Sequence, residues 1–188
     1  MSAISTNDIK PGMALDLPDG LFQITEYQHV KPGKGKAFVR TKLKNLETGA
    51  NLDRTFRADE TVERAIIDRR DHQFLYRDDM GFNFMDGETY AQMALSADQV
   101  GSAANFLVDG ATVILAMYQG RAVDLDLPVS IELEVTQAEP GVKGDRVSGA
   151  TKPVTLQTGL VVQVPLFVEQ GDRIKVDTRS GEYMTRVS

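Results

Sequence analysis

Short segments rich in β-branched and aromatic residues recur along the whole chain, and turn sequences separate them. Glycine, proline and aspartate mark these turns, as in the Pro-Asp-Gly at residues 18–20 and the Thr-Gly at residues 48–49. We predict strands at the following positions: residues 13–17, 21–30, 36–46, 51–57, 73–79, 81–86, 111–128, 129–137, 160–168 and 172–187. Many short strands at this spacing are typical of β-barrels or sandwiches. The chain is therefore predicted to be almost entirely β.

One stretch has the sequence of a helix start. Ser96 and Gln99 have the spacing of a capping box, in which two side chains satisfy free backbone N–H groups of the first turn. Apolar residues follow at helical spacing: Val100, Ala103, Ala104 and Leu107. We predict one short helix at about residues 97–108, and the acidic segment at residues 58–65 suggests one additional helical turn.

Charge is distributed unevenly along the chain, although the formal net charge of the 188 residues is −6. Residues 1–64 hold 10 basic and 9 acidic side chains, residues 65–127 hold 4 and 10, and residues 128–188 hold 7 and 8. Within the first block, residues 30–57 have a local charge of +6. A basic segment on an otherwise acidic chain indicates a surface that meets phosphate. The alternative is a solvated face that neighbouring acidic residues balance.

Several kinds of chemistry lack the residues that they need. The chain has no cysteine, and its two histidines, His29 and His72, are too far apart for a metal-ligand motif. A G-x-S-x-G motif is absent, and the glycines and lysines of residues 33–36 lack the spacing of a phosphate-binding P-loop. The best carboxylate pairs flank predicted turns: Asp78 with Asp79, and Asp124 with Asp126. We therefore expect no catalytic residue, no metal site and no bound cofactor.

The beginning of the sequence and its hydropathy indicate where the protein is expected to work. The first residues lack the basic and apolar segments of a signal peptide, and no apolar run approaches the roughly 20 residues of a membrane span. The absence of cysteine fits a reducing compartment. We expect a cytoplasmic protein with no membrane partner.

The sequence Lys-Pro-Gly-Lys-Gly-Lys at residues 31–36 lies between two predicted strands and is predicted to form the tip of a hairpin. Residues 31–34 have the pattern of a type II turn, in which Gly33 would supply the positive φ of the third position. Lys34 is then expected at the tip, where Gly33 and Gly35 keep the loop thin enough to enter a narrow crevice. Two further lysines flank the tip and can meet phosphates: Lys31 and Lys36. An ordinary solvated turn is the alternative.

Four segments of the chain resemble the bacterial elongation factor P family. They are VKPGKGKAFVRTKLKNLETG at residues 30–49, GVKGDR at 141–146, KPVTLQTGLVVQVPLFV at 152–168 and VDTRSGEYMTRV at 176–187. These matches follow the order and spacing of the family along the whole chain. The resemblance implies three small β-barrels in an elongated array: an N-terminal SH3-like (KOW-like) barrel at residues 1–64, an OB-fold barrel with the short helix at 65–127, and a C-terminal OB-fold barrel at 128–188.

The resemblance also implies which residues meet RNA. Lys34 matches the tip residue that points at the CCA end of the P-site tRNA, and in many members this lysine carries a post-translational extension. Residues 144–146 match a loop that approaches the E-site codon, and Arg146 departs from the Gly-Asp-Thr that is common there. Tyr183 and Arg186 match a C-terminal pair that faces the anticodon arm of the tRNA. The expected RNA-binding residues besides Lys34 are Lys31, Pro32, Gly33, Gly35, Lys36, Arg40, Lys42, Gly144, Asp145, Arg146, Tyr183 and Arg186.

By this resemblance, the function is to bind the 70S ribosome between the P and E sites, to position the CCA end of peptidyl-tRNA, and to stimulate peptide bond formation at consecutive prolines. The implied partners are the ribosome, P-site peptidyl-tRNA and, where Lys34 is extended, a lysine-modifying enzyme; we expect a monomer. A general single-strand RNA-binding protein is the rival hypothesis, and it needs a basic groove with exposed aromatic residues. Phe82 and Phe84 alternate and could share such a face, but a place in the core suits them better. An enzyme acting on RNA has no support in the sequence.

Overall fold

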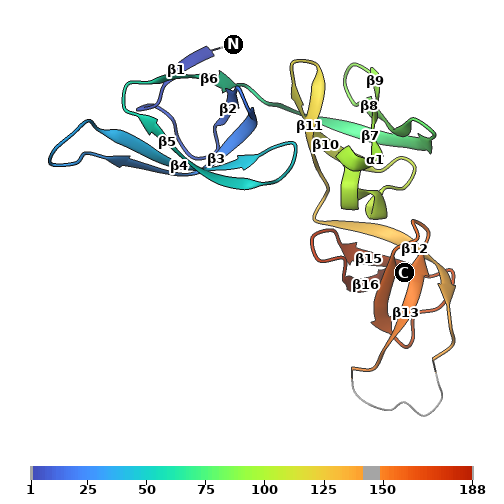
Figure 1. The fold of residues 1–188 in the computed structure, drawn as a ribbon. Helices are drawn as coiled ribbons and strands as arrows, with labels where there is room; N and C mark the ends of the chain where they lie inside the picture. The colour runs from blue at the N-terminus through green and yellow to red at the C-terminus, as the bar shows by residue number, and fades with distance from the viewer. Residues whose placement is uncertain (1, 142–148, 188) are drawn as a thin grey trace. The chain divides into compact units, whose positions relative to one another are not determined.

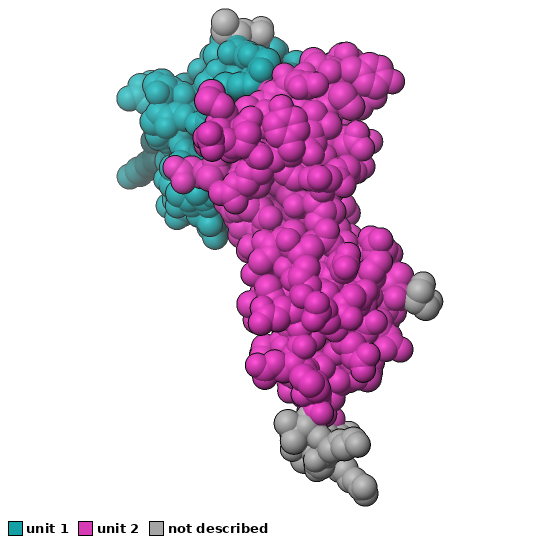
Figure 2. Space-filling view, turned by 90° about the vertical axis from the view of Figure 1, so that its right-hand side faces the viewer, with its two compact units in different colours: residues 1–69, 116–124 teal, residues 70–115, 125–188 magenta. Residues whose placement is uncertain are grey.

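The computed structural model describes residues 2–141 and 149–187 (Figure 1). Contacts group the chain into two compact units, which Figure 2 distinguishes by colour: unit 1 comprises residues 1–69 and 116–124, and unit 2 comprises residues 70–115 and 125–188. Strands dominate the described residues, so the prediction of a nearly all-β protein is confirmed. Within these ranges no helix is long and apolar enough to cross a membrane. The three domain boundaries and the elongated array stay predictions.

Unit 1 is built on a curled, six-stranded antiparallel sheet (Figure 1). Its strands, in spatial order, are β1 (Ser2–Ser5), β6 (Thr61–Ala65), β2 (Ala14–Leu17), β3 (Gly20–Val30), β4 (Phe38–Asn45) and β5 (Asn51–Arg57). The backbone N–H of Thr6 donates to the carbonyl of Glu60, and its hydroxyl donates to the carbonyl of Arg57 at 2.7 Å. These bonds fix the end of β1 to the connection between β5 and β6.

The alternation of residues along β4 explains why this segment forms a strand with one buried face. Three alternate side chains are buried against the core: Val39, Thr41 and Leu43. The intervening basic side chains are exposed: Arg40, Lys42 and Lys44. The basic segment is therefore the outer face of a strand whose inner face holds the barrel together.

The predicted helical turn within residues 58–65 is wrong, because residues Thr61–Ala65 form β6. This strand lies between β1 and β2, and it buries Val62 and Ala65. Pairing with β1 stabilises the extended conformation of residues 61–65. β1 itself, formed by Ser2–Ser5, lacks the alternating pattern from which a strand could be predicted. Two further strands were missed for the same reason: β9 (Gln92–Leu95) and β13 (Thr151–Leu156).

A second sheet has the spatial order β11-β10-β7-β8-β9. Its remaining strands are β7 (Asp68–Asp78), β8 (Gly81–Asp86), β10 (Thr112–Tyr118) and β11 (Arg121–Asp126). Phe82 and Phe84 are buried, and their ring centroids lie 5.9 Å and 5.5 Å from that of Phe74. The preference for a core position over a base-stacking face is confirmed for both residues.

The tip of the β10–β11 hairpin belongs to unit 1. Ala116, Tyr118 and Val123 form a buried cluster with apolar residues of the first sheet, namely Ala14, Leu21 and Ala65. The Tyr118 hydroxyl donates to Oδ2 of Asp16 at 2.8 Å, and this bond raises the pKa of the tyrosine. Arg121 also makes an ion pair with Glu47. Unit 1 is therefore built from two stretches of chain that are far apart in the sequence.

The predicted helix begins where the capping box places it. The Ser96 side chain accepts from the Gln99 backbone N–H at 3.2 Å, and the Gln99 side chain accepts from the Ser96 N–H at 2.9 Å. The α-helical part, α1 (Ala97–Val100), is a single turn, because Gly101 takes a φ of +56°. A 3₁₀ helix, η1 (Gly101–Phe106), continues the segment to a point slightly before the predicted end.

The third sheet has the order β14-β13-β12-β15-β16 and lies in unit 2. Besides β13, its strands are β12 (Ser130–Ala138), β14 (Val161–Pro165), β15 (Arg173–Asp177) and β16 (Tyr183–Val187). Phe106 at the end of η1 is part of its buried core, together with residues such as Leu133 and Ile174. The Thr158 hydroxyl donates to the carbonyl of Asn105 at 2.6 Å and fixes the same segment.

Candidate nucleic-acid interface

The lysine-rich loop closes the long β3–β4 hairpin (Figure 1). The two strands pair as far as Val30 and Phe38, which leaves residues 31–37 as the loop between them. All residues of the Lys-Pro-Gly-Lys-Gly-Lys sequence at 31–36 are exposed. Within the described residues, no salt bridge involves Lys34. The tip lysine is therefore a solvated cation at the end of a narrow hairpin.

The predicted type II turn is wrong, because the glycine with a positive φ in this loop is Gly35, at +106°, and Gly33 is not among the described residues with positive φ. The reversal takes place over a seven-residue loop, so it is not confined to the four residues of a β-turn. A Cβ built on Gly33 meets nothing within 4 Å, and one built on Gly35 meets only Pro32 Cγ at 3.9 Å. The expectation of a thin, open tip is thus supported, although the conformational role belongs to the second glycine.

Two basic side chains on the outer face of β4 have different neighbours. Lys42 lies between Glu26 of β3 and Asp53 of β5 in the sheet register, and its Nζ is 3.3 Å from Oε2 of Glu26. Arg40 lies between the uncharged residues Gln28 and Thr55. The positive charge at Arg40 is therefore more available to an outside phosphate than the charge at Lys42.

Arg40 also has an ordered environment. Its Cζ lies 5.5 Å from the centroid of the Phe38 ring, a distance at which the aromatic face attracts the cation. No acidic side chain forms a salt bridge with it in the part of the chain that the structure describes. Arg40 and the loop lysines are therefore among the cations of the basic segment that no acidic side chain compensates in the described residues.

Arg54 belongs to the same basic segment but is compensated from outside it. Both of its terminal nitrogens donate to the Asp19 carboxylate, at 3.0 Å and 2.5 Å. This bidentate contact lowers the pKa of Asp19 and raises the pKa of Arg54. Together, Asp19 and Glu26 bear out part of the alternative interpretation, in which neighbouring acidic residues balance the local charge of +6.

Tyr183 and Arg186, the predicted C-terminal pair, lie on one face of β16. Three positions along a regular strand would place them on opposite faces, but a bulge shifts the register between Lys175 and Val176. Tyr183 is thereby paired with Val176, and Arg186 is paired with Ile174. Since Ile174 and Val176 share a face of β15, their two partners share a face as well.

Arg186 contacts two residues that the sequence did not indicate. Its Nη1 lies 3.7 Å from Oδ2 of Asp172, and its Cζ lies 5.0 Å from the centroid of the exposed Phe167 ring. These contacts could not be predicted from the spacing of residues in the sequence, because they depend on the position of the loop between β14 and β15. The predicted residues Gly144, Asp145 and Arg146 lie outside the described residues.

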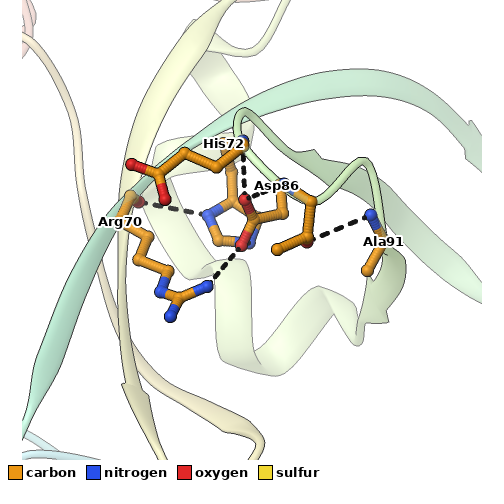
Figure 3. Close-up of polar contacts among 6 residues, drawn as sticks. Arg70, His72, Asp86 and Ala91 are labelled. Carbon is orange, nitrogen blue, oxygen red and sulfur yellow. Dashed lines mark hydrogen bonds and ion pairs between the residues drawn. The ribbon is translucent and has the colours of Figure 1, made fainter.

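A polar cluster in unit 2 contains the buried histidine, His72 (Figure 3). Its Nδ1 donates to the carbonyl of Arg70 at 3.1 Å, and its Nε2 lies 3.9 Å from Oδ2 of Asp86. Oδ1 of Asp86 accepts from the backbone N–H groups of Thr89 and Glu88, and these bonds lower the pKa of Asp86 to about 2. The cluster fixes the turn after β8, and His72 is a buried histidine of β7 that contributes to it.

The described residues contain no group of three or more histidine, cysteine, aspartate or glutamate side chains that could hold a metal ion. Several carboxylates instead pair with arginine, lysine or backbone N–H groups, as Asp19, Glu26 and Asp86 do. The chemistry that the exposed side chains of the hairpin offer is the binding of anions.

Two solved structures have a fold similar to that of this chain. The chain is similar to a structure called eukaryotic translation initiation factor 5A from Methanococcus jannaschii, with a TM-score of 0.55, 22% identity, and coverage of 68% of this chain and 92% of that one. It is also similar to a translation initiation factor eif-5a family protein from Naegleria fowleri, with a TM-score of 0.54, 18% identity, and coverage of 67% and 98%. At these identities, the likeness concerns the fold alone.

Family models and relatives are more specific. Three models match: "Elongation factor P (EF-P) KOW-like domain" at residues 5–62, "Elongation factor P (EF-P) OB domain" at 67–125, and "Elongation factor P, C-terminal" at 131–186. Relatives called elongation factor P are 54% identical in Symbiobacterium thermophilum, over 97% of this chain and 99% of that one, and 55% identical in Mycobacteroides abscessus, over 98% of each. The chain belongs to the elongation factor P family of translation factors, whose partner is the ribosome.

Proposed function

We propose that this protein binds the 70S ribosome between the P and E sites, positions the CCA end of P-site peptidyl-tRNA and stimulates peptide bond formation at consecutive prolines. The observation that carries the proposal is the solvated Lys34 at the end of a thin hairpin, flanked by uncompensated basic side chains. Membership of the elongation factor P family supports the translational setting.

The mechanism needs positioning and no acid–base partner. Proline reacts poorly because its nitrogen is secondary and its ring restricts the backbone, so much of the barrier is one of geometry. A factor that holds the CCA end in a reactive pose lowers this entropic barrier, while the ribosome supplies the peptidyl-transfer site. The Lys34 ammonium, or a group attached to it, donates hydrogen bonds to the terminal nucleotides. The protein is then an accessory factor in the cytoplasm and not an enzyme.

A basic face behind the tip supplies affinity for RNA phosphates. Lys31, Lys36 and Arg40 are exposed cations on the loop and the adjoining strand. Pro32 and Gly35 shape the loop between them. Lys42 belongs to this predicted face, but it must exchange its ion pair with Glu26 for a phosphate before it can contribute. The face therefore has its strongest part near the tip.

The C-terminal pair provides a second contact in this proposal. Tyr183 and Arg186 share one face of β16, which is required if both are to meet the anticodon arm of a single tRNA. The family resemblance assigns residues 144–146 to the E-site codon. A lysine-modifying enzyme is the remaining proposed partner, and intact-mass measurement of the protein purified from its own host decides whether Lys34 carries an extension.

The direct test replaces Lys34 by alanine and measures the synthesis of Pro-Pro-Pro and of a proline-free tripeptide on reconstituted ribosomes. We expect the variant to bind ribosomes and to lose its stimulation of Pro-Pro-Pro, while the control peptide is made at the unassisted rate. Wild-type stimulation by Lys34→Ala would refute the mechanism. Equal affinity for ribosomes and for random single-stranded oligonucleotides would favour the rival, a general RNA-binding protein.

A further inference from the structure

The guanidinium of Arg186, in the last sheet, has an aromatic and an acidic neighbour. Phe167 lies under its Cζ at 5.0 Å, and Asp172 lies 3.7 Å from its Nη1. The second distance is longer than a hydrogen bond, and the aromatic ring accepts no strong hydrogen bond. Among the described residues, these two contacts orient the guanidinium while its donors stay available for an external acceptor.

The loop that carries Phe167 and Asp172 is fixed to the body of the sheet. Oδ2 of Asp172 accepts from the backbone N–H of Glu169 at 2.9 Å, and the N–H of Gly171 donates to the carbonyl of Val135 at 2.8 Å. Val168, the neighbour of Phe167, is fully buried in the core. The ring and the carboxylate therefore hold defined positions, and Arg186 contacts both.

Burial in the core does not explain why an aromatic residue occupies position 167. The residue remains 55% exposed, although an apolar side chain gains stability by leaving water. The side chain of Arg186, which approaches this ring, is itself 49% exposed. An exposed aromatic ring whose polar neighbour is a half-exposed cation fits a role in holding that cation for a ligand.

We propose that Phe167 is a positioning residue that orients Arg186 toward a phosphate of RNA. The inference rests on the proposed function, in which Arg186 faces a tRNA arm. A guanidinium that is already oriented loses less conformational entropy when it binds, so the ring increases affinity without touching the RNA. The contact with Asp172 further limits this orientation.

The test is a double-mutant cycle on the affinity of the full chain for 70S ribosomes that carry P-site tRNA. Phe167→Leu should weaken binding about two- to fivefold in the wild-type background, as expected for an exposed cation–π contact. It should have no effect in the Arg186→Gln background. Phe167→Tyr keeps the aromatic face and should restore wild-type affinity. Arg186→Gln should reduce the slope of log affinity against log salt by about 0.7 to 0.9, the value for one phosphate contact.

Tyr76→Leu is the matched control, because Tyr76 is an aromatic residue of the same unit with 49% exposure. It should leave affinity unchanged. An equal loss from Phe167→Leu in both Arg186 backgrounds would overturn the positioning role. An unchanged affinity of Arg186→Gln would overturn the phosphate contact, and the Pro-Pro-Pro assay of Lys34→Ala would still decide the proposed function separately.

Discussion

The hairpin tip and the last strand each present a cation to the outside, but they hold it in opposite ways. Lys34 is on a loop without regular backbone pairing, and no side chain of the described residues forms a salt bridge with it. Arg186 is on a strand and contacts a ring and a carboxylate. A lysine is flexible and compact, whereas an arginine is planar and directional. The comparison indicates that the tip allows the Lys34 side chain to extend into a narrow site, whereas the strand holds the Arg186 guanidinium in one orientation.

The largest expected effect comes from replacing one kind of cation by the other at the tip. If intact mass shows an added group on Lys34 in the native host, Lys34→Arg should lose all stimulation of Pro-Pro-Pro synthesis, because a guanidinium is not the substrate of a lysine-modifying enzyme. The change in folding stability should stay within about 0.5 kcal/mol, since the side chain is exposed. Full stimulation by Lys34→Arg from such a host would show that neither the extension nor the ammonium matters.

The next effect separates the two glycines of the tip. Gly35→Ala places a side chain at a φ of +106°, which should cost about 1 to 2 kcal/mol in the loop and displace Lys34. Stimulation of Pro-Pro-Pro synthesis should fall clearly. Gly33→Ala is the comparison variant, because it adds the same methyl group to the tip at a position without a positive φ and so isolates the effect of a thicker tip. Equal activity of both variants would mean that the loop conformation does not control the lysine.

A third prediction concerns Asp86, a carboxylate that backbone N–H groups fix and that takes no part in the proposed RNA contacts. The pKa of Asp86 is lowered to about 2, mainly by the N–H groups of Thr89 and Glu88. Its ionised form therefore stabilises the fold above the unfolded pKa of about 4, and this contribution is lost as the pH falls toward 2. Asp86→Asn should unfold at lower urea than wild type at pH 7, and the difference should shrink between pH 4 and pH 2.

Asp86→Asn should also leave the stimulation of Pro-Pro-Pro synthesis intact under conditions in which the variant is folded. Asp86→Asn is thus expected to change stability and leave activity unchanged, whereas substitution of Lys34 is expected to change activity and leave stability unchanged. A difference in urea midpoint that is constant from pH 7 to pH 2 would contradict the role of the ionised carboxylate.

The smallest effect compares two cations on one strand. Arg40→Gln should reduce the salt slope of ribosome binding by about 0.7 to 0.9, as for the loss of one phosphate contact. Lys42→Gln should reduce it less, because Glu26 already compensates Lys42 at 3.3 Å. Binding measured between 50 mM and 200 mM salt distinguishes the two. Equal slopes for both variants would show that the ion pair is broken when the protein binds.

The sequence predicted most strands and the start of the helix because their signals are local. The alternation along Phe38–Asn45 and the Ser96–Gln99 capping box can both be read from neighbouring residues. Strands β1 and β6 could not be predicted, because non-local pairing stabilises them: β1 pairs with β6, and β6 pairs with both β1 and β2. The turn at the tip was assigned to Gly33 because the sequence does not reveal how many residues share a reversal.

Some residues of the candidate site could be predicted and others could not, again because only local signals can be read from the sequence. Lys34 and its neighbours could be identified from a contiguous motif and a family resemblance. The compensation of Lys42 by Glu26 depends on register, and the contacts of Arg186 with Phe167 and Asp172 depend on the position of a loop. The bulge that brings Tyr183 and Arg186 to one face is likewise a property of two paired strands.

The discontinuous build of unit 1 has a consequence for synthesis of the chain. Its apolar cluster joins Ala14, Leu21 and Ala65 to Ala116, Tyr118 and Val123. During translation at about 5 to 20 residues per second, the early half of this cluster therefore waits about 3 to 10 s for the late half. In that interval, its apolar surface is open to water and to other nascent chains. The yield of folded protein should therefore depend on the rate at which the chain is translated. A pause between the codons for residues 69 and 116 should increase aggregation.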